Sequence, residues 1–224
     1  MDNMSVIIPA YNEELILGDT IRAIKDFYHV NQIIVVDDGS KDKTSLIAQK
    51  LGAQVIIHKN NLGKGSALNS ASHLVTGDII VLLDADLGKS AGKFYQLIPP
   101  ILTGKADVTL AKFSPPPVPG GFGLVKGLAS ISVFILTGQI LSSPLSGQRA
   151  MTKEVFKSIL PFAGGYGVEI GATVEIIKKG WRLQEVEIDM VHRFTKRDFS
   201  GFLHRGRQFY DICCVLAQKI KGNE

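Results

Sequence analysis

Residues 33–51 have the sequence IIVVDDGSKDKTSLIAQKL, in which an apolar β-branched run precedes a polar turn and a segment with helical spacing. This order predicts one strand, a turn and one helix. The same pattern recurs on both sides of it. Further strands are predicted at residues 5–8, 54–57, 79–83 and 108–110, and further helices at residues 13–27, 66–75 and 91–102. The alternation predicts an α/β fold with a mostly parallel central sheet and helices on both faces.

Polar residues follow three of the predicted strands. They are Ala10-Tyr11-Asn12-Glu13, Asp37-Asp38-Gly39-Ser40 and Asp84-Ala85-Asp86. Because the carboxyl ends of parallel strands meet at one edge of a sheet, we expect five carboxylates to converge there. Such a cluster needs cations or hydrogen-bond donors to offset the repulsion. The sequence therefore predicts a ligand site at this edge.

The second half of the chain follows a different pattern. Residues 114–121 (SPPPVPGG) predict a loop, either a lid or a connector. The apolar segment 124–141 is short for a membrane span and contains Lys126 and Gln139, so we expect a buried or surface-seated helix. Beyond it, the spacing predicts helices from near residue 152, at 168–179 and at 200–219, and a strand at 181–191.

Length and composition limit the class of protein. The 224 residues predict one domain, and 45% hydrophobic with 21% charged residues excludes a disordered chain. The net charge of +4 is too small to indicate a nucleic-acid-binding protein. The excess lies in residues 192–224, which hold seven basic and three acidic side chains, so a phosphate-rich partner is expected near that end.

The cysteines and the first residues bear on location. Cys213 and Cys214 are adjacent and cannot link distant segments. The first residues lack the pattern of a signal peptide. We therefore expect a cytoplasmic protein, with peripheral contact at the inner membrane face as an alternative.

The Asp84-Ala85-Asp86 motif predicts a metal site. Carboxylate oxygens are preferred ligands of Mg²⁺ and Mn²⁺, which usually share their coordination shell with substrate phosphates. The alternative is that one aspartate caps the next helix. Asp38 also has two interpretations. It either caps the turn, or it accepts hydrogen bonds from a nucleobase or ribose.

A glycine-rich segment follows the third predicted strand. Residues 62–66 (LGKGS) precede a predicted helix, where backbone N–H groups and Lys64 can bind an anion. The spacing differs from that of a P-loop, and no dinucleotide-binding glycine motif follows the first strand. These differences argue against a P-loop NTPase and a nicotinamide-dependent enzyme.

The order of PAYNE (9–13), VVDDGS (35–40), NLGKGSALN (61–69) and LLDADL (82–87) resembles family 2-type glycosyltransferases. The resemblance implies a GT-A, Rossmann-like fold with a mixed, mostly parallel sheet and a C-terminal helix, and a nucleotide-diphosphosugar donor. In such enzymes the residues matching Pro9, Tyr11, Glu13 and Asp38 hold the nucleoside. The residue matching Asp86 binds the divalent cation, and the one matching Asp84 lies near the donor ribose or sugar.

The second half resembles the glucosyl-3-phosphoglycerate synthases. The resemblance is carried by PLSGQRA (144–150), GYGVEIG (165–171) and His192-Arg193. It implies that Lys64 contacts the donor nucleotide, Glu169 contacts sugar or acceptor hydroxyls, and His192 is a metal ligand. Polyprenyl- and dolichyl-phosphate mannose synthases share the motifs of the first half. They often carry a ligating residue where this chain has Gly88, so His192 supports the phosphoglycerate enzymes.

The sequence thus predicts a metal-dependent glycosyltransferase that uses Mg²⁺ or Mn²⁺. We expect residues 1–112 to bind the nucleotide sugar, 113–191 to form the acceptor side and 192–224 to form a basic tail. The predicted catalytic residues are Asp84, Asp86 and Glu169, and the predicted metal ligands are Asp86 and His192. The predicted donor-binding residues are Pro9, Ala10, Tyr11, Asn12, Glu13, Asp38, Lys64, Ala85 and Arg193.

The partners and competing functions follow from the same motifs. We expect a UDP- or GDP-sugar donor, such as UDP-glucose or GDP-mannose, and a phosphorylated small molecule as acceptor, with no nucleic acid. A polyprenyl-phosphate acceptor at a membrane surface is the alternative, and residues 124–141 and the tail are candidate homodimer surfaces. A nucleotidyltransferase that makes sugar nucleotides and a non-catalytic nucleotide-sugar binder are the competing functions.

Overall fold

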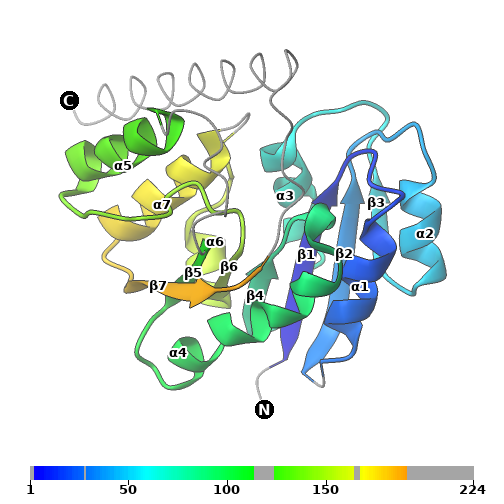
Figure 1. The fold of residues 1–224 in the computed structure, drawn as a ribbon, viewed down its shortest axis with the longest axis horizontal. Helices are drawn as coiled ribbons and strands as arrows, with labels where there is room; N and C mark the ends of the chain where they lie inside the picture. Colours follow the sequence, from blue (N-terminus) through cyan, green and yellow to red (C-terminus); the bar gives the residue numbers. More distant parts are fainter. Residues whose placement is uncertain (1–2, 28, 114–123, 164–166, 191–224) are drawn as a thin grey trace.

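The computed structural model describes residues 3–27, 29–113, 124–163 and 167–190 (Figure 1). Strands from both predicted halves form one seven-stranded sheet in the order β3-β2-β1-β4-β6-β5-β7. Their bounds are β1 Met4–Ala10, β2 Val30–Asp37, β3 Gln54–Ile57, β4 Ile79–Leu82, β5 Val108–Phe113, β6 Arg149–Thr152 and β7 Leu183–Ile188.

The sheet is mixed and mostly parallel, as expected. β1 pairs in parallel with β2 and β4, β2 with β3, and β5 with β7. β6 runs antiparallel to both of its neighbours, β4 and β5. The parallel pairing of β2, β1 and β4 brings their carboxyl ends to one edge, where the polar residues of the motifs follow.

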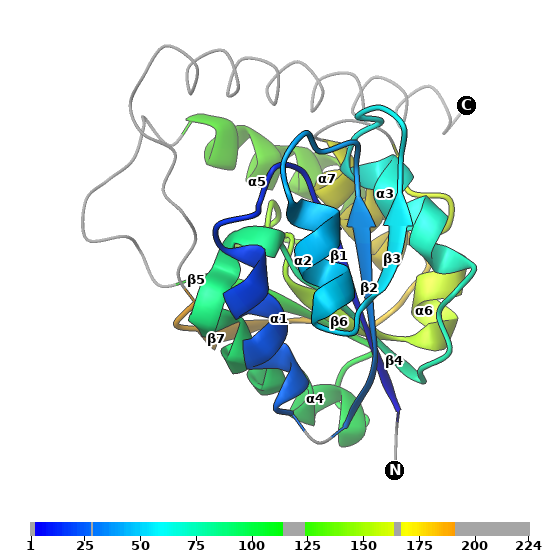
Figure 2. The same cartoon turned by 90° about the vertical axis from the view of Figure 1, so that its right-hand side faces the viewer.

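Helices cover both faces of the sheet (Figure 2). One face carries α1 Leu17–Lys25, α2 Thr44–Lys50, the 3₁₀ helix η1 Ala85–Leu97 and α4 Pro99–Leu102. The other carries α3 Lys64–Ser72, α6 Lys153–Ser158 and α7 Val168–Lys178. α5 Leu124–Thr137 packs against α7 through a smaller apolar cluster that includes Val133 and Val174.

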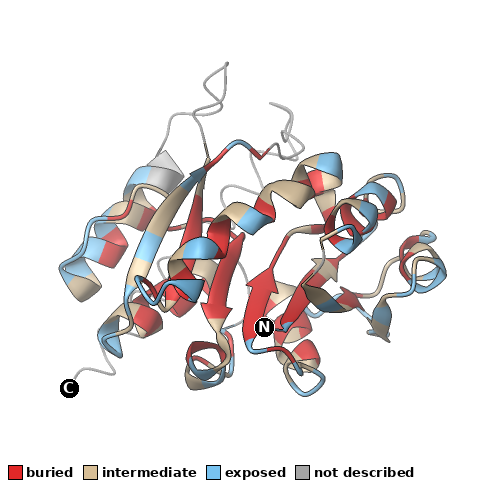
Figure 3. Cartoon of the chain, turned by 90° about the horizontal axis from the view of Figure 1, so that it is seen from below, coloured by how far each residue is buried: buried red, intermediate tan, exposed pale blue. Residues whose placement is uncertain are grey.

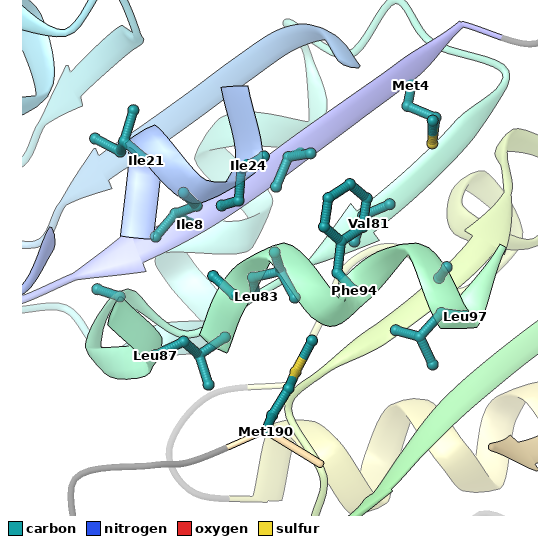
Figure 4. Packing of buried hydrophobic residues seen from close by; sticks show 14 of the residues in the cluster. Met4, Ile8, Ile21, Ile24, Val81, Leu83, Leu87, Phe94, Leu97 and Met190 are labelled. Atoms are coloured by element: carbon teal, nitrogen blue, oxygen red, sulfur yellow. The ribbon is translucent and has the colours of Figure 1, made fainter. Parts of the chain in front are cut away.

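The central strands are buried on both faces (Figure 3). In β1, Val6 and Ile8 belong to one core while Ile7 belongs to the other. This alternation is the period of two that a strand imposes. In the first core, Phe94 of η1 packs among side chains that include Met4, Ile24 and Val81 (Figure 4). Burial on both sides fixes the register of the strands, and so fixes where their polar ends lie.

One predicted helix is wrong, and one strand was not predicted. The helix expected at 91–102 is instead the 3₁₀ helix η1 followed by α4; Gly88, with φ 54°, interrupts the first, and α4 begins at Pro99. β6 was not predicted, because a four-residue strand containing Arg149 shows no apolar run. The loop 114–121 and the helix at 200–219 lie outside the described residues.

In the part of the chain that the structure describes, no helix has the length and apolar character needed to cross a bilayer.

Candidate active site

The loop after β1 is held against the loop after β2. The Asn12 amide donates to Ser40 Oγ (2.9 Å), Asn12 Oδ1 accepts from the Lys41 amide (2.8 Å), and the Glu13 amide donates to Thr44 Oγ1 (2.9 Å). Asn12 adopts φ +55°, which asparagine tolerates better than most residues. The loop after β1 is therefore fixed by hydrogen bonds between backbone amides and side chains of the two segments.

The predicted donor-binding residues of this loop differ in exposure. Ala10 is buried and Pro9 is half-buried, whereas the Tyr11 side chain is 44% exposed. An exposed aromatic ring on a fixed loop is suited to stack on a nucleobase. The role of these residues in donor binding remains a prediction.

Lys64 joins two of the predicted catalytic carboxylates. Its Nζ lies 2.6 Å from Asp84 Oδ1 and 2.8 Å from Glu169 Oε1. Lys64 begins α3, Asp84 follows β4, and Glu169 lies in the first turn of α7, so three distant segments meet here. Desolvation lowers the pKa of Lys64, but the charges and hydrogen bonds of Asp84 and Glu169 outweigh it and raise the pKa above the usual lysine value. The amine is therefore a fixed cation.

The segment before β6 packs against Asp84 and Lys64. Gln148 is fully buried, and its Nε2 donates to Asp84 Oδ2 at 2.5 Å. A Cβ on Gly147 would lie 2.5 Å from Lys64 Nζ and 2.9 Å from Asp84 Oδ2, so only glycine leaves room for the pair. The sequence marked this segment as a motif but assigned no role to Gln148, because nothing local shows that its side chain points to Asp84.

A buried arginine lies beside the same centre. Arg149 is 2% exposed and donates to the Ser146 carbonyl at 2.8 Å. Burial lowers the pKa of Arg149, and the charges of Glu169 and Asp84 oppose that change. Arg149, Lys64, Gly147 and Glu169 form the polar wall of a cleft. Its apolar wall consists of Leu68, Leu82, Phe162, Val168 and Ala172.

Asp38 lies at the expected edge, but protein donors surround it. It is 4% exposed; Oδ1 accepts from the Leu62 amide (2.9 Å) and contacts His58 Nδ1 (2.6 Å), while Oδ2 accepts from the Gly63 amide (2.8 Å). His58 was not selected from the sequence. Its one signal was its position directly after the strand at 54–57, which places it at the same edge.

Asp86 is the predicted metal ligand that the structure describes. It is half-buried in the first turn of η1, two residues after Asp84. Asp84 occupies the N-cap position of η1 but makes no side-chain capping hydrogen bond, so helix capping does not account for it. Asp86 lies just after β4, at the edge of the sheet, and its carboxylate oxygens are ligands of the kind that Mg²⁺ and Mn²⁺ prefer.

The second metal ligand was predicted in a part of the chain that the structure does not describe. His192 and Arg193 lie outside the described residues. Within the described ranges, no three His, Cys, Asp or Glu side chains gather as a metal site. A cation on one protein carboxylate fits the chemistry of Mg²⁺, which is commonly bound through one or two carboxylates together with substrate phosphates.

Solved structures share this fold. A crystal structure of glucosyl-3-phosphoglycerate synthase from Mycobacterium tuberculosis, in complex with Mn²⁺, UDP and glucosyl-3-phosphoglycerate, matches with a TM-score of 0.81 and 30% identity, covering 97% of this chain and 80% of that chain. Another, of the same enzyme with Mg²⁺ and UDP, matches with a TM-score of 0.80 and 29% identity over 97% of this chain and 79% of that chain. The mixed sheet with its flanking helices is therefore the GT-A fold.

Sequence comparison leads to the same group. The Petrotoga mobilis glucosyl-3-phosphoglycerate synthase is 33% identical over 79% of this chain, and the M. tuberculosis enzyme is 33% identical over 77%. The chain spans 61% and 60% of their lengths, respectively. An uncharacterised protein of Methanocaldococcus jannaschii is 30% identical over 98% of this chain and 93% of its own length. The model of glycosyl transferase family 2 matches residues 5–124, and the chain belongs to that family.

Proposed function

We propose that this protein transfers a hexosyl group from a nucleotide-diphosphosugar to a phosphate-bearing acceptor of the phosphoglycerate type, with Mg²⁺ or Mn²⁺. The observation that carries the proposal is Lys64, held between Glu169 and Asp84 at the edge where β4 ends; Asp84 stands two residues before Asp86. Relatives of 29–30% identity with Mn²⁺, UDP-glucose and phosphoglyceric acid in their crystals support it.

The chemistry of such a transfer matches the charges of the site. Breaking the anomeric C–O bond passes through an oxocarbenium-like state, and negative charge grows on the departing nucleoside diphosphate. A divalent cation, when bound, stabilises that charge as a Lewis acid. Asp86 would hold the cation with His192, and Lys64 places a second, permanent positive charge nearby.

The carboxylates have separate roles in this proposal. Gln148 and Lys64 fix both oxygens of Asp84, so its orientation is set before a donor sugar or ribose contacts it. Glu169 is 14% exposed in the wall of the cleft, where it would contact a sugar or acceptor hydroxyl. Arg193 and the basic tail would supply the charge that a phosphate-bearing acceptor requires.

A lipid-phosphate acceptor is the second candidate. On α5, Ile131, Phe134 and Ile135 are at least half exposed and lie at helical spacing, so they form an apolar stripe. The sequence from residue 108 to 153 contains no Asp or Glu. An apolar stripe in a stretch of sequence without acidic residues suits an anionic lipid surface.

A transfer assay separates these functions. We expect the purified chain to release UDP or GDP from UDP-glucose or GDP-mannose and to glycosylate 3-phosphoglycerate, and EDTA to stop both. Product formed only on polyprenyl phosphate in anionic vesicles would support the lipid acceptor instead. Pyrophosphate release from a nucleoside triphosphate and a sugar phosphate would contradict the proposal and support a nucleotidyltransferase.

A further inference from the structure

We propose that His58 and Asp38 are positioning residues that hold Lys64 in the candidate active site. The inference rests on the proposed function, because it takes Lys64 to act on the donor. It assigns Asp38 a role inside the protein, in addition to the nucleoside contact that the family resemblance implies.

Asp38 anchors the loop before α3. Both oxygens of Asp38 accept hydrogen bonds from this loop, through the Leu62 and Gly63 amides at 2.9 and 2.8 Å. Gly63 is the N-cap of α3, and Lys64 is the first residue of that helix. A buried carboxylate that accepts two backbone N–H bonds is a strong local tether, because both bonds are charge-assisted.

The buried His58 supports the carboxylate of Asp38 that anchors this loop. The His58 side chain is 8% exposed, and its Nδ1 lies 2.6 Å from Asp38 Oδ1. A carboxylate only accepts, so the proton is on Nδ1. Nε2 lies 2.9 Å from Ser70 Oγ, which belongs to α3 itself. His58 thus links the end of β2 to the helix that carries Lys64.

The loop before α3 also contacts the turn after β2. A Cβ on Gly39 would lie 2.6 Å from the Asn60 carbonyl carbon and 2.8 Å from the Asn61 nitrogen. The backbone of the loop therefore rests directly on Gly39. The His58 amide also donates to the Asp37 carbonyl at 2.9 Å, which fixes the start of the same loop.

These contacts fix the backbone that carries the Lys64 side chain. A lysine side chain has four rotatable bonds, and ordering it costs conformational entropy. Lys64 reaches Asp84 and Glu169, on two other elements, only if its backbone is fixed. Asp38, His58 and Gly39 provide that fixed backbone.

Asp38, His58 and Ser70 are connected in the same order as the acid, base and nucleophile of a hydrolytic triad. Ser70 lies within α3, where backbone N–H groups are bonded along the helix. They cannot form the oxyanion hole that a nucleophilic serine needs. The geometry therefore supports a positioning role.

The experiment compares His58→Leu with His58→Asn. Leucine removes the donor to Asp38, whereas the asparagine amide can replace Nδ1. We expect His58→Leu to lower kcat by about 10–100-fold, the range seen when supporting groups are removed, with the KM for the donor little changed. His58→Asn should restore most of the loss. Equal kcat in His58→Leu and the unmodified protein, or a higher KM with kcat unchanged, would overturn the inference.

A second readout does not require activity. The rate at which an amine-reactive reagent labels Lys64, measured by mass spectrometry against exposed Lys41, reports whether Lys64 is held. We expect faster labelling of Lys64 in His58→Leu and in Gly39→Ala, which displaces the loop without altering His58. Unchanged labelling in both variants would overturn the inference.

The matched control is Gly180→Ala. Gly180 also has a positive φ, 77° against 80° for Gly39, but nothing lies within 4 Å of an added Cβ. It should leave the labelling of Lys64 unchanged. If the unmodified protein transfers no sugar, the proposed function fails, while the labelling rates still decide whether His58 and Gly39 hold Lys64.

Discussion

Asp86→Ala is expected to abolish the metal-dependent part of nucleotide binding and to lower transfer by about 1,000-fold. The physical reason is that Asp86, just after β4, is the proposed ligand of the cation, and carboxylate oxygens are the ligands that Mg²⁺ and Mn²⁺ prefer. Loss of one group that stabilises developing charge costs about 100–1,000-fold, and loss of the cation removes a full double charge.

Calorimetric titration of UDP and GDP with and without Mn²⁺ measures the effect on binding. Asp26→Ala is the matched control, because Asp26 is an exposed carboxylate at the C-terminal end of α1, away from the edge where β4 ends. We expect Asp26→Ala to titrate like the unmodified protein. If Asp86→Ala keeps its Mn²⁺-dependent affinity, the cation is held elsewhere.

Lys64→Met is expected to lower kcat by about 100–1,000-fold. The methionine keeps most of the length of the side chain but removes the positive charge between Asp84 and Glu169. The two carboxylates would then lack the cation that lies between them, and the site would lose a donor near the departing diphosphate. Breaking a largely desolvated charge pair by removing one partner also costs stability, so unfolding should occur at a lower temperature.

The control for Lys64→Met is Lys50→Met, at the exposed C-terminal end of α2. Steady-state kinetics and thermal unfolding of both variants separate the loss of charge in the site from the loss of charge on the surface. A Lys64→Met protein with normal kcat would show that the amine has a purely structural role.

The first half of the fold could be predicted because its signals are local. Strands such as β3, predicted at 54–57 and found at Gln54–Ile57, are short apolar runs bounded by turns. The mixed character of the sheet followed from the resemblance alone. β6 could not be predicted, since its pairing with β4 and β5 depends on contacts between distant segments.

In the candidate site, too, local sequence signals could be predicted and contacts between distant segments could not. Asp84, Lys64 and Glu169 were singled out from three separate motifs, and the structure brings them together. The contacts of Asp38 with His58 and of Asp84 with Gln148 depend on where loops pack, which no local pattern records. Sequence therefore identified the charged groups, while the structure was needed to find what orients them.

The most direct test of the account is the thermal unfolding of the protein with UDP, GDP, UDP-glucose and GDP-mannose, each with and without Mn²⁺. The site is proposed to bind a nucleoside diphosphate through a cation on Asp86, so one nucleotide should stabilise the protein only when Mn²⁺ is present. At about 100 times the dissociation constant, the added stability is about 2.7 kcal/mol, a clear rise in melting temperature. No shift with any nucleotide, or the same shift without Mn²⁺, would contradict the account.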